Sequence, residues 1–401
     1  MRIALFTETF LPRVDGIVTR LTHTIVELQR AGDDVLVIAP KKPGLPDEYA
    51  GAQVVGMPSM PFLLYPDWRL SSPFPATKTY AALATFQPDL IHTVSPFAVG
   101  LGAIGYARRH NKPLIASYHA NIATYARHYH LRVVEGFLWW YLRSLHLQAQ
   151  LTLATSRPIQ AELRARGFGR IELWEPGVDA KLFHPRPQDD PMRVAMRERL
   201  TDGHSEAPLL LYVGRLAAEK SLERLLPALR HLPGVRLAFV GDGPAAGATR
   251  RMFAGQPVVF AGQLFGEELA AAYAAADVFT LPSSTETLGF VAIEAMASGV
   301  AVVGARRGGL PDIVAHGETG LLFDPDAPAT PDGLVPALKR LLASPAERER
   351  MGHAARQRAE GWDWPATTAA LRHQYAAVLQ DAATKQRRDA KVYERQTLSP
   401  G

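Results

Sequence analysis

The stretch "SSTETLGFVAIEAMASGV", residues 283–300, carries two glutamates, Glu286 and Glu294, on either side of Thr-Leu-Gly-Phe. The preceding "DVFTLP" has the character of a buried strand, and "GFVAIEAMA" has apolar residues at helical spacing up to Gly299. The segment therefore predicts a strand, a short loop and a helix. The start of such a helix presents free backbone N–H groups and the positive end of a dipole, which favour an anion such as phosphate.

The two carboxylates have two interpretations. Glu286 falls in the predicted loop, and Glu294 follows it by eight residues, which is up to about 12 Å along a helix axis. Both can be solvated surface charges. Alternatively they flank a diphosphate at the helix start, one carboxylate binding the hydroxyls of a sugar and the other those of a ribose. The second arrangement describes a nucleotide sugar, and this segment alone leaves both open.

Length and composition restrict the class of protein. A chain of 401 residues is expected to form two domains, and 47% apolar with 21% charged residues is typical of a soluble globular protein. The sequence has no apolar run of the ~18 residues that a membrane span needs, and Glu8 interrupts any signal-peptide core. It has no cysteine, so disulfides and thiolate metal sites are excluded. We expect a cytoplasmic location.

The basic surplus lies in the N-terminal half. Residues 1–186 contain 20 Lys and Arg against 14 Asp and Glu, in a chain of net charge +5. An excess of this kind fits nucleic acid, an anionic membrane surface or an acidic substrate. No helix-turn-helix, zinc-finger or RNA-recognition pattern supports nucleic acid, so a membrane surface is favoured.

The chain alternates strand-like and helical segments in two series, which predicts parallel sheets covered on both faces. The fold class is therefore α/β, with two doubly wound, Rossmann-like domains facing each other across a cleft that binds the ligand. The Pro-rich "HPRPQDDPM" at 184–192 is the expected linker. We assign residues 1–186 and 187–362 to the two domains, 363–385 to a C-terminal helix, and 386–401 to a disordered tail.

Two glycine-containing segments follow strands in the second half. "VGDGPAAG" at 240–247 resembles a dinucleotide fingerprint, but the next strand, "VVFAGQL", lacks the acid that would hold a ribose, so a dehydrogenase is disfavoured. In "YVGRLAAEKSLERLL" a strand ends at Gly214, and Arg215 and Lys220 follow it. Two cations there can clamp a diphosphate or form surface ion pairs. Together with residues 283–300 the clamp is favoured.

In the first half, Gly16 lies in the loop between the first strand and its helix, where a glycine allows a ligand to approach. His119 lies at the carboxyl end of a strand, facing the cleft. The segment 133–148 predicts an apolar helical stripe of Val134, Phe137, Leu138, Tyr141, Leu142 and Leu145. Trp139, Trp140, Arg143 and His146 fall outside it, which is typical of an interfacial membrane helix but equally of packing under a loop.

These motifs carry a resemblance to a known family. The Glu286-x7-Glu294 spacing with "EAMASG", together with "VGRLAAEKS", "GDGP" and "GVDAKLFHP", resembles glycosyltransferase family 4, whose members are retaining enzymes of the GT-B fold. The match covers nearly the whole chain. The segments "MRIALFTETFLPRVDGIVTRL", "YPDWRLSSP", "SYHANI", "EGFLWWYLRS" and "TETLGFVAIEAMASGV" are most similar to the sulfoquinovosyldiacylglycerol synthases, peripheral membrane enzymes that transfer sulfoquinovose from UDP-sulfoquinovose to diacylglycerol.

The resemblance implies residue roles. Arg215 and Lys220 would bind the diphosphate, Glu294 the ribose and Glu286 the transferred sugar, and His119 would join Glu286, Arg215 and Lys220 in catalysis. The implied donor-binding set is Gly16, Gly214, Arg215, Lys220, Gly241, Asp242, Gly262, Gln263, Leu264, Glu286, Thr287, Leu288, Gly289, Phe290 and Glu294. The implied acceptor and membrane contacts are Trp68, Arg127, Trp139, Trp140 and Arg143.

The implied partners are a UDP-sugar, diacylglycerol or another lipid, and the anionic inner face of a membrane, with no metal or other cofactor. One position departs from the synthases, because Pro176 stands where they tend to carry a basic residue. If that cation holds the sulfonate, Arg13 or Arg127 is the candidate replacement; otherwise the donor is an ordinary UDP-hexose such as UDP-glucose or UDP-galactose. Transfer to a soluble acceptor, and a non-catalytic module that only binds a nucleotide sugar, also stay open.

Overall fold

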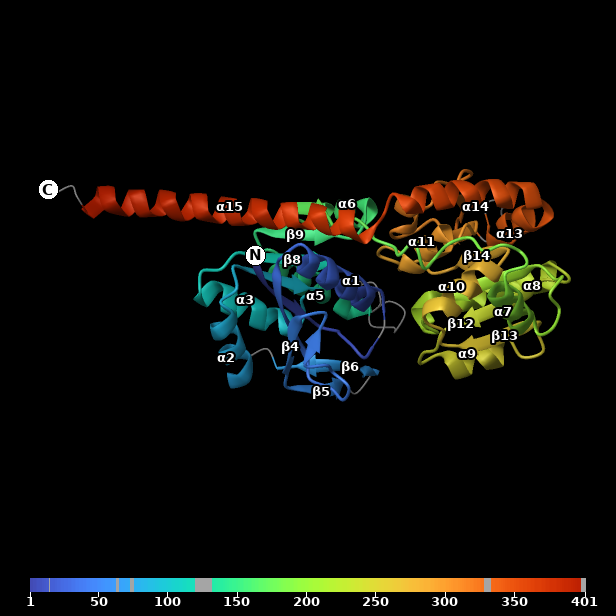
Figure 1. The fold of residues 1–401 in the computed structure, drawn as a ribbon, viewed down its shortest axis with the longest axis horizontal. Helices are drawn as coiled ribbons and strands as arrows, with labels where there is room; N and C mark the ends of the chain where they lie inside the picture. The colour runs from blue at the N-terminus through green and yellow to red at the C-terminus, as the bar shows by residue number, and fades with distance from the viewer. Residues whose placement is uncertain (14, 63–64, 73–75, 120–131, 328–332, 398–401) are drawn as a thin grey trace.

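The computed structural model describes residues 1–401 except 14, 63–64, 73–75, 120–131, 328–332 and 398–401, and it contains two α/β domains that lie side by side (Figure 1). The first sheet has the strand order β10-β9-β8-β7-β1-β2-β4-β3, and the second has the order β13-β12-β11-β14-β15-β16. Among the described residues, neighbouring strands in these two sheets run parallel except β3 with β4. The predicted pair of doubly wound domains is therefore confirmed.

The strands of the first sheet alternate with helices. The strands are β1 (Arg2–Thr7), β2 (Asp34–Pro40), β3 (Glu48–Tyr49), β4 (Ala52–Met57), β7 (Leu90–Val94), β8 (Leu114–Tyr118), β9 (Leu151–Ala154) and β10 (Ile171–Leu173), with a separate antiparallel hairpin of β5 (Ser59–Phe62) and β6 (Tyr65–Ser71). The helices are α1 (Gly16–Arg30), α2 (Thr77–Phe86), α3 (Val99–Arg109), α5 (Arg132–His146) and α6 (Arg157–Ala165).

The second domain follows a stretch without helix or strand at 184–190. Its strands are β11 (Leu209–Val213), β12 (Arg236–Val240), β13 (Val258–Gly262), β14 (Val278–Leu281), β15 (Val302–Ala305) and β16 (Gly320–Phe323). Its helices are α7 (Pro191–Thr201), α8 (Leu226–His231), α9 (Ala246–Met252), α10 (Gly266–Ala275), α11 (Phe290–Ala297), α12 (Leu310–Ile313), α13 (Leu334–Ala343) and α14 (Pro345–Glu360), with 3₁₀ turns at Ala218–Lys220 and Leu222–Leu225.

The strand order fixes where a ligand can bind. In each sheet the chain first adds strands on one side of the starting strand and then crosses to the other side. As a result β1 lies between β2 and β7, and β11 lies between β12 and β14. At such a reversal the loops leaving adjacent strands diverge, which opens a crevice outside the carboxyl ends of the strands. The expected sites are therefore the carboxyl ends of β1 and β7 in one domain, and of β11 and β14 in the other.

The last helix, α15 (Trp364–Thr397), follows the second domain but lies across the first (Figure 1). Leu371, Tyr375 and Val378 of this helix belong to the buried cluster formed by β1, α1, β2 and their neighbours. The return to the first domain agrees with the implied crossing. The predicted end at residue 385 is wrong, because the helix continues through residues 386–397, which the sequence assigned to a disordered tail.

Candidate functional site

Two oppositely charged side chains meet at the carboxyl edge of the second sheet. Lys220 follows β11 and Glu286 follows β14, and the two strands are hydrogen-bonded neighbours. Lys220 Nζ donates to Glu286 Oε1 at 2.6 Å, and both side chains are largely buried. The structure therefore brings together two residues that are 66 positions apart in the sequence and that the resemblance places in one site.

Arg215 lies at the same edge and forms an ion pair with Glu219, which is buried. The backbone carbonyl of Glu219 accepts the hydroxyl of Thr285 at 3.2 Å, and the phenol of Tyr212 donates to the carbonyl of Arg215 at 3.0 Å. These contacts fix the turn that carries both cations against the loop that carries Glu286. Glu219 was not among the predicted site residues, although an acid four residues after an arginine is a recognisable ion-pair signal.

The glycines at this edge serve the packing of the backbone. A Cβ at Gly241 would lie 2.1 Å from the carbonyl oxygen of Gly214, and both residues have positive φ, +131° and +147°. Any larger side chain at Gly241 would separate the ends of β11 and β12. Asp242 is exposed, and its carboxylate accepts the N–H of Gly243 at 2.8 Å. The residue that lies closest to Gly241 is thus Gly214 on the neighbouring strand.

The start of α11 has the features of an anion site. Gly289 is the N-cap residue and has φ +99°, and no side chain caps the helix, which begins at Phe290. Thr287 and Leu288 form the loop just before it. The segment after β15 packs against this loop. The N–H of Gly309 donates to the carbonyl of Glu286 at 2.7 Å, and a Cβ at Gly308 would lie 2.1 Å from that oxygen. This glycine pair was not predicted, although the "RRGG" pattern signals a turn.

Glu294 lies on α11, and its carboxylate accepts the phenol of Tyr273 at 2.7 Å. Burial raises the pKa of Glu294 from 4.5 to about 7, and the hydrogen bond from Tyr273 opposes this only in part. The ionised form of such a buried carboxyl is stabilised when further hydroxyl groups donate hydrogen bonds to it. Among the other predicted donor contacts, Gln263 is exposed, Gly262 has φ +75°, and the side chain of Leu264 belongs to the domain core.

The first domain is in direct contact with this loop. The hydroxyl of Thr287 donates to the carbonyl of His119 at 2.6 Å, and Thr155 and Ser156 donate to the carbonyl of Thr287 at 2.8 and 2.9 Å. A Cβ at Gly16 would lie 3.1 Å from the ring of Phe290. The structure thus brings the 287–290 segment against both residues of the first domain that were predicted to face the cleft.

The imidazole of His119 is buried and neutral. Its Nε2 is 2.9 Å from Ser117 Oγ, and its ring packs edge-on against Trp174. Burial lowers the pKa of His119 well below its usual value, and the charge of Arg20 lowers it further. Ser117 Oγ is also 3.0 Å from His92, whose other nitrogen is 2.7 Å from the phenol of Tyr375 on α15. A hydrogen-bonded chain therefore joins His119 to the C-terminal helix.

Arg20 is a buried cation that the sequence patterns did not reveal. Its guanidinium carbon lies 4.7 Å from the ring of Trp174 and 5.1 Å from the ring of Phe290, so it joins the first domain to the first residue of α11. Its Nη1 donates to the carbonyl of Trp174 at 3.0 Å. An arginine inside an amphipathic helix is usually interpreted as a surface charge, and only the fold reveals its burial.

The outward face that the membrane interpretation assigned to α5 is wrong for two of its four residues, Trp139 and His146, which are buried. Trp139 is 7% exposed, stacks on Tyr118, and carries the guanidinium of Arg166 3.8 Å above its ring, so it belongs to a core cluster. Trp140 is 61% exposed, and Phe137, assigned to the buried stripe, is 57% exposed. His146 is also buried, with Nδ1 3.2 Å from the hydroxyl of Thr152.

The other predicted acceptor contacts are Arg143, Trp68 and Arg127. Arg143 is exposed and donates to the carbonyl of Gly167 at 2.8 Å. The side chain of Trp68 and all of Arg127 lie outside the described residues. In the described part of the chain, no group of three or more acidic or histidine side chains is arranged to hold a metal ion. No described helix combines the length and apolarity that crossing a bilayer requires.

Two family models match the chain, one for each domain. Residues 14–182 match the model "Glycosyltransferase Family 4", and residues 200–358 match "Glycosyl transferases group 1". Each match lies within one domain, because the first spans β2 to β10, which is the first sheet without β1, and the second spans β11 to β16.

Individual relatives match over nearly the full length. A sulfoquinovosyl transferase of Arabidopsis thaliana is 40% identical over 94% of this chain and 74% of its own. A GDP-mannose-dependent alpha-mannosyltransferase of Mycolicibacterium smegmatis is 37% identical over 94% of this chain and 98% of its own. Among solved structures, sucrose-phosphate synthase from Thermosynechococcus elongatus superposes with a TM-score of 0.77 at 25% identity, covering 94% of this chain and 99% of that one.

Proposed function

The chain belongs to glycosyltransferase family 4, and from this premise we propose that it transfers sulfoquinovose from UDP-sulfoquinovose to the hydroxyl of diacylglycerol. It is a retaining hexosyltransferase of the GT-B fold. The observation that carries the proposal is the convergence of Lys220, Glu286 and the uncapped start of α11 at the carboxyl edge of the second sheet. The 40% identity to a sulfoquinovosyl transferase supports the donor sugar.

In the proposed complex the diphosphate of the donor lies between the cations and α11. Lys220 pairs with Glu286 in the structure, and a phosphate oxygen would take the place of that carboxylate. Glu286 is then released to accept hydroxyl groups of the sugar, so binding of the diphosphate and positioning of the sugar are coupled. Arg215 and the backbone N–H groups at the start of α11 add fixed positive charge where the leaving group becomes more negative.

The transfer breaks the bond between the anomeric carbon and the diphosphate oxygen, and it forms a bond from that carbon to the acceptor oxygen on the same face. The acceptor's proton passes to the departing diphosphate, so the products are UDP and a glycolipid. Because burial lowers the pKa of His119 well below its usual value, its imidazole is neutral and suited to hydrogen-bonding a sugar hydroxyl. Catalysis then rests on orientation and on stabilisation of the leaving group.

A lipid acceptor requires contact with a membrane surface. Phe137 and Trp140 are exposed neighbours on α5, with ring centroids 5.6 Å apart. Exposed aromatic rings beside cations favour the interface of a bilayer, and the basic surplus of residues 1–186 favours an anionic one. We propose that α5 contacts the inner face of the membrane through these two rings.

A donor panel tests the proposed function. Purified protein is incubated with diacylglycerol vesicles and UDP-sulfoquinovose, UDP-glucose, UDP-galactose or GDP-mannose, and the lipid products are identified by mass spectrometry. We expect a sulfonated glycolipid. The similarity to a GDP-mannose-dependent enzyme favours mannosyl transfer as the second candidate. Hexosyl lipid without a sulfonated product would overturn the proposed donor, and UDP binding without any turnover would indicate a binding module.

A further inference from the structure

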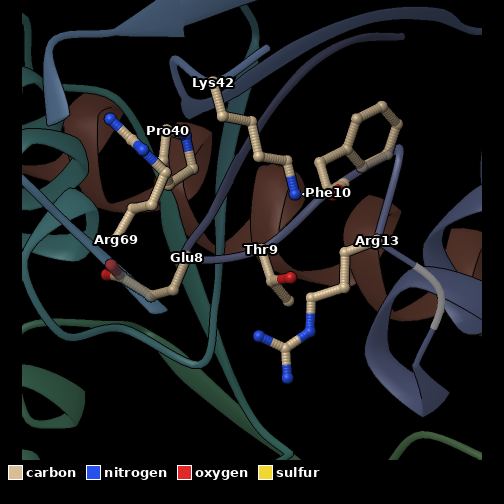
Figure 2. Close-up of a pocket in the computed structure, with 7 residues that line it drawn as sticks. All are labelled: Glu8, Thr9, Phe10, Arg13, Pro40, Lys42 and Arg69. Carbon is tan, nitrogen blue, oxygen red and sulfur yellow. Dashed lines mark hydrogen bonds between the residues drawn. The ribbon is translucent and has the colours of Figure 1, made fainter. Parts of the chain in front are cut away.

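A pocket lined by three cations lies at the carboxyl edge of the first sheet, in the described part of the domain (Figure 2). The pocket is small and opens to solvent. Its lining comprises Glu8, Thr9, Phe10, Arg13, Pro40, Lys42 and Arg69. These residues come from the end of β1, the end of β2 and the hairpin strand β6, so the fold assembles the pocket from three separate segments.

Contacts among the described residues hold the three cations in place, and those of Lys42 and Arg69 use only part of the donors of each side chain. Lys42 Nζ donates to the carbonyl of Phe10 at 2.6 Å, which uses one of its three donors. Arg69 donates through Nε and Nη2 to Ser59 at 2.8 and 2.9 Å, which uses two of its five. Arg13 forms an ion pair with Asp15 at 3.0 Å. Each head group is thus fixed by the protein before any ligand arrives.

The field in the pocket is positive. Burial lowers the pKa of Lys42, and the charges of Arg13 and Arg69 lower it further, while Asp15 alone opposes them. Asp15 has a separate task, because its other oxygen caps α1 by accepting the N–H groups of Ile17 and Val18 at 3.0 Å each. Among the described groups that act on Lys42, the cations outnumber this carboxylate, and an anion entering the pocket would relieve their mutual repulsion.

Glu8, also in the lining, balances this charge only in part. Its carboxyl accepts the N–H groups of Phe97 and Gly100 at the start of α3, at 2.7 and 3.0 Å. Burial nevertheless raises the pKa of Glu8 from 4.5 to about 7, so near neutral pH it is protonated in a large part of the molecules. In that form it offers a neutral hydrogen-bonding group beside the three cations.

We propose that Arg13, Lys42 and Arg69 form a subsite for a tetrahedral oxyanion, a sulfonate or a phosphate carried by one of the substrates, with Glu8 hydrogen-bonding to a hydroxyl of the same molecule. Arg13 is three residues before Gly16, which packs against Phe290, so the subsite adjoins the cleft from the side of the first domain. The group comes from one of two sources. It is the sulfonate of the donor sugar, which rests on the proposed function, or the phosphate of a lipid head group.

Binding of small probes tests the subsite without turnover. The probes are sulfoquinovose and sn-glycerol 3-phosphate, with glucose and glycerol as uncharged counterparts, measured by saturation-transfer NMR. We expect at least one charged probe to bind about tenfold more tightly than its counterpart, and to lose this advantage in Lys42→Gln and Arg69→Gln. Lys41→Gln is the matched control, because Lys41 is an exposed neighbour outside the lining. The probe that binds identifies the source.

Two results would overturn the proposal: neither charged probe binds the wild-type protein better than its counterpart, or Lys42→Gln and Arg69→Gln bind as Lys41→Gln does. Lys42→Arg and Arg69→Lys retain the charge and should recover part of the binding, which a merely structural role would not explain. Circular dichroism and melting curves verify that each variant is folded. Because these probes need no transfer reaction, a failed donor panel and a failed subsite are separate outcomes.

Discussion

Protonation of Glu294 should make nucleoside binding depend on pH. Burial raises the pKa of this carboxyl to about 7 in the ligand-free structure. In the proposed complex the ribose hydroxyls donate to it, which stabilises the carboxylate and lowers its pKa. Binding must then release a proton when the pH lies between the bound and the free pKa. Affinity is therefore expected to rise with pH up to about pH 7 and to level off above it.

The size of the effect follows from the two pKa values. If the bound carboxyl returns to its ordinary pKa of 4.5 from about 7, the coupling is about 3 kcal/mol at 1.36 kcal/mol per unit. The dissociation constant should then fall roughly tenfold for each pH unit inside that window. Glu294→Gln keeps an acceptor for Tyr273 but cannot ionise, so its affinity should not change with pH over the same range.

Uridine is the suitable ligand, because it lacks the phosphate groups that titrate near neutral pH. Isothermal calorimetry between pH 5 and pH 8, repeated in two buffers with different protonation enthalpies, measures both the affinity and the protons released. Wild-type protein should release a fraction of a proton that approaches one in the middle of the window, and Glu294→Gln should release none. Equal pH dependence in the two proteins would refute the assignment of Glu294 to the ribose.

Lys220→Ala should lower kcat by about 10²–10³, as expected when one preorganised charge at a leaving group is removed; near-normal turnover in a folded variant would exclude the clamp. Trp139→Ala should cost about 3–5 kcal/mol of unfolding free energy because its ring is in the core, measured by urea denaturation. Phe137→Ser with Trp140→Ser should leave that stability nearly unchanged but weaken co-sedimentation with anionic vesicles, and equal binding would move the membrane contact elsewhere. EDTA should leave turnover intact, since Lys220 and its neighbours supply the positive charge; loss of activity restored by Mg²⁺ would contradict this.

The architecture was predictable because it depends on local patterns. Strand-like runs alternating with helical ones specify a parallel, doubly wound sheet, and that order puts the residues after β11 and β14 at one edge. The proximity of Lys220 and Glu286 follows from this rule, because each residue lies in the segment that follows one of these two strands. No knowledge of side-chain packing is needed for either step.

The predictions from sequence were wrong or incomplete where contacts with residues distant in sequence determine the burial of a side chain. The rotation of α5 depends on Tyr118 and Phe168, which surround Trp139, and helical periodicity gives no information about them. From its sequence context Arg20 is expected at the surface, and only its contacts with Trp174 and Phe290 in the fold show that it is buried. The cationic pocket is assembled from three separate segments, so no single stretch of sequence displays it.

The position of α15 has a consequence for synthesis on the ribosome. The first domain is translated first, yet its hydrophobic core includes Leu371, Tyr375 and Val378. At ~5–20 residues per second, the roughly 200 residues between β10 and this helix delay its arrival by about 10–40 s. During that interval the surface awaiting α15 is exposed, and the second domain can fold before the first is complete. The first domain of a nascent chain can therefore be completed only after the second domain has been synthesised, and the apolar surface that α15 covers is available to chaperones throughout that interval.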